Sequence, residues 1–574
     1  MARELKLSIG QYSDRGRKEV NQDFHGAMIP TQPLLGLKGI AVGLADGISS
    51  SAVSHSASES AVGGFLVDYY CTPESWSVKT SAQRVIDATN SWLHAQTRRG
   101  QHAYDQDKGY VCTLDVMVFK SRATHIFHIG DSRVYRLSGH SLEQLTDDHR
   151  VFISSAESYL GRALGVNPQV EIDYRMLPLE TGDVFVLATD GVYEHVSASF
   201  IAGAVARDLD TGAKAIVEEA YNQGSPDNLT VQLVRIDELP DGAVDEVLGH
   251  ASELPLPPLL EPRMVFDGYE IVRQIHASSR SHIYLASDQD TGAVVAIKIP
   301  SIDLRGDPDY LRRFLMEEWV ARRIDNAHVL KSPSPSRDKK FIYTVTEFVE
   351  GQTLTQWMID NPRPNLESVR GIVEQIATGL RAFHRLEMVH QDLRPENVMI
   401  DRLGTVKIID FGSTRIAGVI EAAPTTDRDG VLGTVQYTAP EYLLGEGGSP
   451  RADIFSLGAI TYQMLMGKLP YGAHMGRART WTQQRKVAYV PARDSNRTLP
   501  EWIDGVLRKA VHPDPGKRYG ELSEFTFDLR HPNPAFLNPV PLPLIERNPL
   551  LFWQVLTAVL VCIIMLLLIY PIRH

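Results

Sequence analysis

The chain has 574 residues, of which 43% are hydrophobic and 22% charged, and its formal net charge is -12. This length exceeds what one hydrophobic core supports, so we expect two or three folded domains. The negative charge, without a dense Lys/Arg stripe, argues against a nucleic-acid partner. The three cysteines form no CxxC pair, which excludes a cysteine zinc site or disulfide framework and fits a reducing compartment.

Proline-rich stretches and the two termini suggest the domain boundaries. The start, MARELKLSIG, has neither a basic n-region nor an apolar h-region, so no secretory signal is expected. Residues 237–267 and 531–549 mix proline with other residues without sustained periodicity, which is typical of linkers. We therefore expect folded domains over residues 1–236 and 268–530, a proline-rich and acidic linker between them, a short tether, and a terminal segment over residues 550–570.

In the first domain, apolar segments of β type each carry an acid at one end. IAVGLA is followed by Asp46, HIFHIG by Asp131 and VFVLAT by Asp190, while Asp227 precedes LTVQLVRI. Neighbouring strands bring their ends together, so these carboxylates can converge at one rim and bind hard divalent cations. Two such ions lower the pKa of a shared water. Any single Asp-Gly pair is better explained as a strand-ending turn, but four in this arrangement favour a metal site.

Six short motifs occur in order: SDRGRKEVNQD from Ser13, LADG from Leu44, GDSR from Gly130, LTDDH from Leu145, TDG from Thr189 and DNLTV from Asp227. With them, residues 8–236 resemble the metal-dependent PPM-type Ser/Thr protein phosphatases. The resemblance implies an α+β domain, a β-sandwich flanked by helices, with two Mn2+ or Mg2+ ions. It assigns these ions to Asp46, the Gly47 carbonyl, Asp190 and Asp227, a third ion to Asp131 with Glu194 as a further candidate, and an outer position to Asp23.

The first domain departs from that family at its phosphate-binding residue. Counting back from Asp23, the expected basic residue falls on Lys18, with Arg17 adjacent. An ammonium lacks the bidentate fork of a guanidinium, so phosphate affinity is expected to be lower. The usual glycine-rich continuation after the first Asp-Gly is ISSSAVSHSAS here, and Gln22 stands where an acid is common. Neither change removes a core metal ligand.

The second domain opens with an alternating pattern from Gly268 that predicts paired strands ending at Lys298. A lysine on a buried strand can reach phosphates if a carboxylate holds it extended. The helix-like stretch DYLRRFLMEEWVARRI offers Glu317 and Glu318 for this role. For Glu318, it stays open that the side chain does not pair with the lysine and simply belongs to a solvent-exposed acidic face of the helix.

Further along, HQDLRPEN from His390, DFG from Asp410, GTVQYTAPE from Gly433, DIFSLG from Asp453 and DPGKRY from Asp514 follow one another. With these motifs, residues 268 to about 530 resemble the Hanks-type (eukaryotic-like) Ser/Thr protein kinases, which are two-lobed α+β domains. By this resemblance Asp392 accepts the hydroxyl proton and Arg394 stabilises the transferring phosphoryl group. Asn397 and Asp410 would hold Mg2+, and Glu317 rather than Glu318 would pair with Lys298.

The same resemblance assigns ATP contacts to Ile275, Ile283, Ala296, Lys298, the Glu347 carbonyl and the Val349 amide, with Asn397 and Asp410 reaching the phosphates through Mg2+, and Thr346 behind the adenine. The phosphate-covering loop, however, has His276, Ser278 and Ser281 where glycines are expected. Backbone approach to ATP is then more hindered, which lowers the expected nucleotide affinity. A pseudokinase is therefore a competing interpretation.

Gln391 replaces the arginine that normally precedes the catalytic Asp in this family. That arginine pairs with a phosphorylated activation loop. Its absence predicts an activity that does not depend on phosphorylation of Thr425, Thr426 or Thr434.

The stretch from Leu550 to Tyr570, LLFWQVLTAVLVCIIMLLLIY, contains no charged residue. As a helix, about 21 residues would span roughly 31 Å against a hydrocarbon core of about 30 Å. A buried terminal helix should show a polar stripe, but only Gln554 and Thr557 interrupt this run. We therefore predict a single transmembrane helix, with both larger domains on the cytoplasmic side of a bacterial inner membrane.

Together the resemblances imply a membrane-tethered bifunctional enzyme that uses ATP, Mg2+, and Mn2+ or Mg2+. Its expected partners are proteins bearing Ser/Thr or phospho-Ser/Thr, its own kinase domain and the lipid bilayer, but no nucleic acid. The alternative is a membrane scaffold in which a nucleotide-sensing pseudokinase regulates an active phosphatase. A receptor kinase with an external sensor is disfavoured because only four residues follow the apolar run.

Overall fold

The computed structural model describes residues 4–100, 105, 108–138, 141–152, 158–206, 208–240, 254–304, 307–333, 337–422, 436–492, 499–537 and 549–569. These residues form two compact units. The first comprises Met1–Leu354, Thr378–Gly433 and Gly448–Pro450. The second comprises Thr355–Ala377, Thr434–Gly447 and Arg451–His574.

The first 240 residues build two antiparallel five-stranded sheets. One sheet has the order β1 (Lys6–Asp14), β12 (Leu229–Glu238), β11 (Val184–Ala188), β6 (Arg133–Ser138) and β7 (Ser141–Gln144). The other has the order β10 (Asp173–Pro178), β5 (Ala123–Ile129), β4 (Leu114–Lys120), β3 (Ile40–Ala45) and β2 (Phe24–Met28). Beside them, β8 (Arg150–Phe152) pairs with β9 (Ser158–Leu160).

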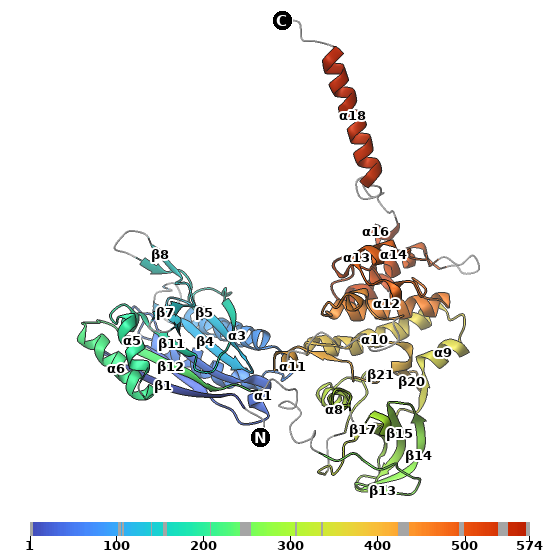
Figure 1. Cartoon of the computed structure of the whole chain (residues 1–574), viewed down its shortest axis with the longest axis horizontal. Helices are drawn as coiled ribbons and strands as arrows, with labels where there is room; N and C mark the ends of the chain where they lie inside the picture. The colour runs from blue at the N-terminus through green and yellow to red at the C-terminus, as the bar shows by residue number, and fades with distance from the viewer. Residues whose placement is uncertain are drawn as a thin grey trace. The chain divides into compact units, whose positions relative to one another are not determined.

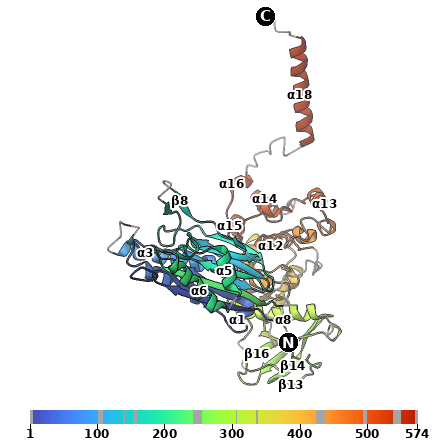
Figure 2. The same cartoon turned by 60° about the vertical axis from the view of Figure 1, so that its left-hand side comes forward.

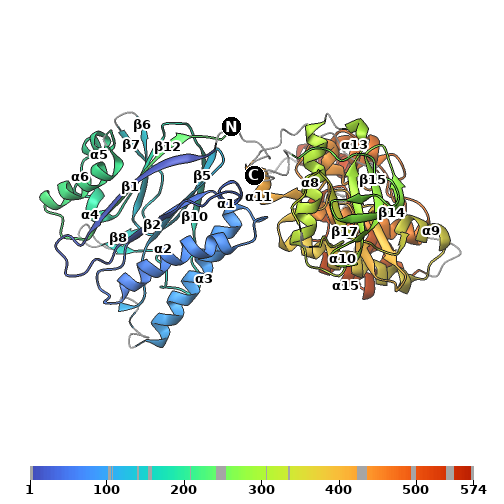
Figure 3. The same cartoon turned by 90° about the horizontal axis from the view of Figure 1, so that it is seen from below.

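The two sheets pack face to face, and helices cover their outer faces. Strand β3 is buried along its whole length because alternate side chains serve two cores. Ile40, Val42 and Leu44 join the core between the sheets, while Ala41 and Ala45 join the core under α2 (Ser54–Cys71) and α3 (Val78–Arg99). Helices α5 (Ala198–Val205) and α6 (Leu209–Asn222) cover the other sheet (Figures 1 and 3). This is the β-sandwich flanked by helices that the sequence predicted.

A buried lysine ends the short helix α1 (Leu34–Lys38) of this domain. The Nζ of Lys38 donates to Thr72 Oγ1 (2.7 Å), the Pro73 carbonyl (2.8 Å) and Ser81 Oγ (3.0 Å). These acceptors do not outweigh burial, which lowers the pKa of Lys38 from 10.5 to about 7.

The depressed pKa of Lys38 predicts a pH-dependent stability. Below pH 7 the folded state bears the full cost of the buried charge, and this cost is relieved as the pH rises from about 7 towards 10.5. The free energy of unfolding should therefore rise by up to about 1.4 kcal/mol per pH unit in that range. Urea unfolding at pH 7, 8 and 9 measures this slope. Lys38→Met should flatten it, whereas Lys214→Met, at an exposed position, should not; equal slopes in both variants would refute the assignment.

A second set of strands follows at residue 265. Strands β13 (Val265–Phe266), β14 (Tyr269–Ala277), β15 (Ser281–Asp288), β16 (Val294–Pro300) and β17 (Thr344–Glu347) form an antiparallel sheet in this order. Helix α8 (Pro308–Arg323) packs against β17 (Figure 2). The alternating pattern from Gly268 thus gives paired strands, as predicted, but Lys298 lies inside β16, which ends two residues later at Pro300.

Short elements of the first unit surround residue 392. Strands β18 (Gly351–Thr353), β20 (Val398–Asp401) and β21 (Val406–Ile408) form a small sheet. Strand β19 (Met388–Val389) pairs with β22 (Arg415–Ile416), and α11 (Ala417–Ala422) follows directly. The ladder β19–β22 therefore joins the residues just before Asp392 to those just after Asp410.

The second unit is helical. It contains α12 (Pro450–Met466), α13 (Trp481–Lys486), α14 (Glu501–Ala510), α15 (Leu522–Arg530) and α16 (Pro534–Leu537). Helices α9 (Leu354–Asp360) and α10 (Leu366–Arg385) each begin or end in the first unit. Helix α12 is buried nearly all round, as expected for a helix at the centre of a helical layer. Helix α14 packs against α15 and α16.

The last helix, α18, covers Pro549–Ile569. Among the residues that the structure describes, no helix combines the length and the apolar character needed to cross a bilayer. The transmembrane helix predicted over residues 550–570 is therefore not supported by the structure.

Candidate active sites

Four aspartates gather where strands of the sandwich end. Asp46 follows β3, Asp131 follows β5, Asp190 opens α4 (Asp190–Tyr193) after β11, and Asp227 precedes β12. Burial, then the nearby carboxylates, raise the pKa of Asp46 well above its ordinary value. Burial together with Asp131 and Asp227 raises the pKa of Asp190 to about 7. These side chains therefore lie close enough to repel one another, and such a cluster is stabilised by cations.

Asp23 and Gly47 complete this cluster. Asp23 is 7% exposed, and its Oδ2 accepts from Thr230 Oγ1 (2.7 Å) and Thr189 Oγ1 (3.1 Å). Its buried Oδ1 has no hydrogen-bond partner among the described residues. At Gly47, a Cβ would lie 2.8 Å from the Gln22 carbonyl oxygen, so the backbone approaches closer than any other residue permits.

The donor set suits divalent cations. It consists of hard oxygens that repel one another, with one buried oxygen left unpaired. Within the described ranges, however, no group of three or more His, Cys, Asp or Glu side chains is arranged so that it could hold a metal ion. Asp46, the Gly47 carbonyl, Asp190 and Asp227 are the residues that would hold two ions.

Arg150 is a site residue that the sequence did not suggest. Its guanidinium donates to Asp131 Oδ2 (2.7 Å), Asp190 Oδ2 (3.0 Å) and Glu194 Oε1 (2.9 Å). It thus engages Asp131 and Glu194, the carboxylates that the resemblance assigned to a third ion. The available signal was weak: Arg150 directly follows the motif LTDDH, at the start of β8.

Removing Arg150 should strengthen metal binding. At an effective dielectric of 20, a unit charge about 4 Å from a carboxylate is worth on the order of 4 kcal/mol, so Arg150 competes with cations. We expect Arg150→Ser to lower the Kd for Mn2+ by at least about tenfold in calorimetric titration. Arg162→Ser, which removes exposed pairs to Asp173 and Glu171, serves as the control and should leave the Kd unchanged. Weaker or equal Mn2+ affinity in Arg150→Ser would contradict this role.

The structure separates the two adjacent candidates for phosphate binding. Lys18 Nζ lies 3.3 Å from Asp227 Oδ1 and donates to Ser49 Oγ (2.9 Å), which places it beside the carboxylates. Arg17 instead donates to the Gly224 carbonyl (2.8 Å) and stacks over the Tyr221 ring. Of the two, Lys18 is the one positioned to meet a substrate phosphate.

In the second catalytic region, a partly buried ion pair links β16 to α8. Lys298 Nζ lies 2.5 Å from Glu317 Oε2 and 4.0 Å from Asp410 Oδ1. The neighbouring Glu318 pairs with Lys339 and with Arg322. The two adjacent glutamates therefore have separate partners, and only Glu317 holds the lysine.

The loop around Asp392 is fixed by its own side chains. Asn397 Nδ2 donates to the Asp392 carbonyl (2.9 Å) and to its Oδ2 (3.3 Å), and Arg394 Nε lies 3.7 Å from the same Oδ2. Burial raises the pKa of Asp392 to about 6. Asp410 has a φ of 68°, which lies in the left-handed region. The ring of the next residue, Phe411, packs against the Phe383 ring, with the two ring centres 5.5 Å apart. Such strained residues are held at functional sites by the packing around them.

The glycine-poor loop forms a turn closed by a serine. Ser278 Oγ accepts from the amides of Arg280 and Ser281, and Ser278 N donates to the Ser281 carbonyl (3.0 Å). Tyr310 of α8 donates to the Arg280 carbonyl. The serine hydroxyl thus occupies backbone donors that a phosphate would otherwise meet.

The remaining residues that were expected to contact ATP lie on the sheet of β13 to β17 and in the segment that follows β17. Ile275 lies on β14, Ile283 pairs with Lys298 in register, and Ala296 pairs with Thr346. The carboxylate of Glu347 accepts from Lys407 Nζ (2.7 Å) and the Lys331 amide (2.9 Å), and Val349 is buried. Thr425, Thr426 and Thr434 lie outside the described residues.

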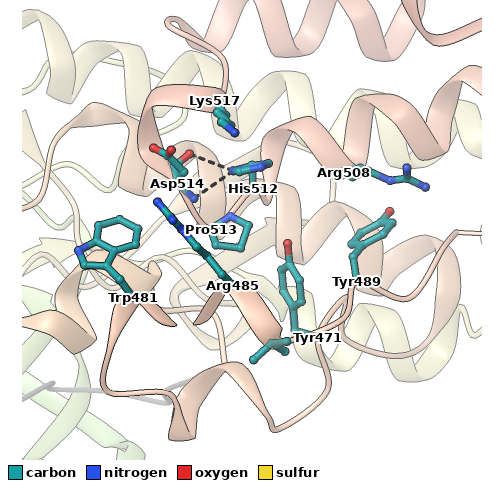
Figure 4. Close-up of a pocket in the computed structure, with 10 residues that line it drawn as sticks. Tyr471, Trp481, Arg485, Tyr489, Arg508, His512, Pro513, Asp514 and Lys517 are labelled. Carbon is teal, nitrogen blue, oxygen red and sulfur yellow. Dashed lines mark hydrogen bonds between the residues drawn. The ribbon is translucent and has the colours of Figure 1, made fainter. Parts of the chain in front are cut away.

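A cavity of about 470 Å³ lies in the second unit, apart from these groups (Figure 4). Its lining includes Tyr471, Trp481, Arg485, Arg508 and Lys517. None of the predicted site residues lines it.

Comparison with known proteins defines both catalytic regions. Residues 11–235 match the family model for protein phosphatase 2C, and residues 269–528 match that for the protein kinase domain. The chain thus contains a PP2C-type phosphatase domain and a Hanks-type Ser/Thr kinase domain.

Curated relatives match the kinase part. Serine/threonine-protein kinase PrkC of Bacillus subtilis is 30% identical over 263 residues, which is 46% of this chain and 40% of the relative. PknL of Mycobacterium tuberculosis is 29% identical over 271 residues, covering 47% of this chain and 67% of the relative. The match spans about two fifths of the length of PrkC and of the PknB relative of Bifidobacterium longum.

Among solved structures, the Mycobacterium tuberculosis phosphatase PstP/Ppp has 24% identity and a TM-score of 0.35, covering 40% of this chain and 99% of that chain. The kinase domain of Mycobacterium tuberculosis PknI has 24% identity and a TM-score of 0.35, covering 48% of this chain and 99% of that chain.

Proposed function

We propose that this chain is a bifunctional enzyme that phosphorylates protein Ser/Thr from ATP and hydrolyses phospho-Ser/Thr. The observation that carries the proposal is the assembled kinase site, in which Lys298 contacts Glu317 at 2.5 Å while Asn397 fixes Asp392. The carboxylate cluster around Asp46 and Asp190 supports the second activity.

In phosphate transfer, Asp392 accepts the proton of the substrate hydroxyl, and Arg394 beside it balances negative charge at the reacting group. Lys298, held extended by Glu317, contacts the nucleotide phosphates. Mg2+, when bound by Asn397 and Asp410, neutralises phosphate charge.

In hydrolysis, Lys18 orients the phosphate of the substrate beside Asp227. Asp46, Asp190 and Asp227 supply the oxygen ligands, and Asp23 supports the cluster through Thr189 and Thr230. Mn2+ or Mg2+, when bound there, supplies the Lewis acidity that phosphate ester hydrolysis needs.

One assay tests both activities. Labelled ATP is incubated with the chain and a protein substrate, with and without Mn2+, and label on protein and label released as phosphate are both counted. We expect Asp392→Asn to remove transfer and, because no labelled phosphoprotein then forms, release as well, whereas Asp190→Asn should remove release only and let label accumulate on protein. Equal transfer by the wild type and Asp392→Asn would refute the kinase activity.

The second candidate function is a scaffold in which a nucleotide-sensing pseudokinase regulates an active phosphatase. The turn closed by Ser278 favours it, because this turn occupies backbone donors near the phosphate position. This candidate predicts no Asp392-dependent transfer in the labelled-ATP assay, together with Asp190-dependent release of phosphate from a protein that is supplied already phosphorylated.

The phosphatase domain could act on its own kinase domain or on a shared protein substrate. Leu260 of the predicted linker is 5% exposed and joins the core of the kinase sheet, so residues 237–267 do not act as one free linker, but both domains still share one chain and meet at a high effective concentration. Action within the chain predicts more bound phosphate in purified Asp190→Asn than in the wild type. Equal phosphate content would instead favour a shared substrate.

We propose that the terminal segment holds the chain at a membrane, with both catalytic domains cytoplasmic. Support comes from α18, where apolar side chains such as Leu550 (70% exposed), Trp553 (57%) and Met565 (57%) are open to solvent. Membrane fractionation of the full chain and of a chain ending at residue 548 tests this localisation. Equal distribution of the two would exclude a role of α18.

A further inference from the structure

Within the first compact unit, the phosphatase domain contacts the kinase domain through built polar interactions. Helix α11 packs beside α1. Trp76 Nε1 donates to the Arg385 carbonyl (2.9 Å). The phosphatase side consists of residues 74–80 and Lys120; the kinase side consists of Arg323, residues 385–387 and α11. We call this region the domain contact.

Two kinase carboxylates complete the N-terminus of α3. Glu387 accepts from the Ser77 amide (2.7 Å), the Ser77 hydroxyl (2.9 Å) and the Thr80 hydroxyl (2.7 Å). Glu421 accepts from the amide of Val78 (2.9 Å). The first amides of a helix have no partner within it, and its dipole favours negative charge at this end. The 22-residue helix α3 thus has its own N-cap, Ser77, which accepts from the Thr80 amide (3.2 Å), and two further carboxylate acceptors from the other domain.

A buried charge and a close backbone approach lie beside this cap. Lys120 is 1% exposed, and its Nζ donates to the Gly418 carbonyl (2.6 Å) and pairs with Glu421 (3.2 Å). Gly418 N donates to the Ser75 carbonyl (2.9 Å). A Cβ at Gly418 would lie only 2.7 Å from the Trp76 carbonyl oxygen, so any larger residue forces the backbones apart.

The domain contact also reaches the helix that holds Lys298. Arg323, the last residue of α8, donates through Nε to Glu74 Oε2 (2.9 Å) and stacks over Trp319 at 3.7 Å. The same helix carries Glu317, the partner of Lys298. A shift at the end of α8 is therefore transmitted to this ion pair.

The domain contact holds one end of the β19–β22 ladder, the end at which Met388 pairs with Ile416. Glu387 directly precedes β19, and Gly418 directly follows the first residue after β22. The Ala417 amide also donates to the Glu387 carbonyl (3.1 Å). Strand β19 leads into Asp392, and β22 follows Asp410 in the chain, so the ladder sets the two aspartates relative to each other.

We infer that the phosphatase domain is a positioning element of the kinase: by holding the β19–β22 ladder and the end of α8, it keeps Asp392, Asp410 and Lys298 aligned for phosphate transfer. This role is independent of phosphate hydrolysis by the same domain. The inference rests on the kinase activity proposed above.

The test uses the full chain in an Asp190→Asn background, so that phosphorylated product is not removed. Gly418→Val separates the backbones without touching either active site, and Glu387→Gln is a milder change that removes one capping charge. Gly371→Ala on α10 is the matched control, because a Cβ there meets nothing within 4 Å. Hydrogen exchange of residues 74–80 and 417–422 reports the contact, and kcat and KM for ATP report transfer.

We expect both variants to speed exchange in both segments and to lower kcat by about tenfold, a typical coupling between sites, with little change in KM. The control should change neither. Faster exchange with unchanged or higher kcat, or unchanged exchange in Gly418→Val, would overturn the inference. If the parent shows no Asp392-dependent transfer, the proposed kinase function fails instead, and the exchange data still decide whether the contact exists.

Discussion

Glu317→Gln is expected to reduce phosphate transfer from ATP by roughly 100- to 1000-fold, the usual effect of losing one group that stabilises transferring charge. Glutamine keeps the shape of the side chain but cannot hold the ammonium of Lys298 by charge. Asp410, 4.0 Å from Lys298, then becomes its strongest partner and draws it away from the nucleotide. Steady-state transfer at saturating ATP measures the loss.

Glu318→Gln is the matched control for that experiment. Both glutamates are buried and each belongs to an ion pair, but Glu318 contacts Lys339 and Arg322 instead of Lys298. Both variants should lose stability, and only Glu317→Gln should lose transfer beyond what the unfolded fraction explains. Equal losses of transfer in the two variants would show that transfer depends on the packing of α8 and not on the contact between Glu317 and Lys298.

Arg518→Ala is expected to destabilise the second unit by about 3–5 kcal/mol, because removing one partner of a buried pair leaves the other charge uncompensated. The Arg518 guanidinium binds both oxygens of Glu441, at 2.8 and 2.6 Å, and the two side chains are 0% and 3% exposed. Its Nε also donates to the His512 carbonyl (2.7 Å). Denaturant unfolding followed by circular dichroism measures the loss.

The control for this prediction is Arg508→Ala in the same unit. Arg508 pairs with Asp504 at 2.8 Å but is 56% exposed, and exposed pairs contribute about 0–1 kcal/mol. A loss in Arg518→Ala no larger than in Arg508→Ala would mean that Glu441 finds another partner or water. The loss of stability in Arg518→Lys should lie between the losses in Arg518→Ala and Arg508→Ala, since an ammonium replaces only part of the bidentate contact.

The sequence predicted the features that depend on local pattern. The strand IAVGLA, with Asp46 at its end, could be read because a run buried on both faces is apolar throughout. The alternating residues before Lys298 predicted paired strands, because successive side chains of a strand point to opposite faces of the sheet. The sequence motifs located the candidate catalytic side chains, because the chemistry of phosphate transfer fixes the spacing between these residues.

What the sequence could not predict depends on contacts between distant segments. Whether Arg17 or Lys18 turns towards the carboxylates is decided by carbonyls at the end of α6, about 200 residues away. Arg150 reaches the metal-binding aspartates only once β8 lies beside them. The capping of Ser77 by Glu387 joins residues 310 positions apart, and neither residue belongs to a recognisable motif.

The capping of α3 by Glu387 and Glu421 bears on how such chains are assembled in evolution. Fusion alone only links two genes, but here each half supplies groups that the other half needs to finish its own backbone hydrogen bonding. Recombination that swaps in an unrelated kinase would leave the Ser77 and Val78 amides without their carboxylate acceptors and Lys120 without its partners. A recombination event that keeps both domains folded must therefore retain residues 74–80, Lys120, Glu387 and α11 together. These residues form one interface, so the two domains are not independent modules.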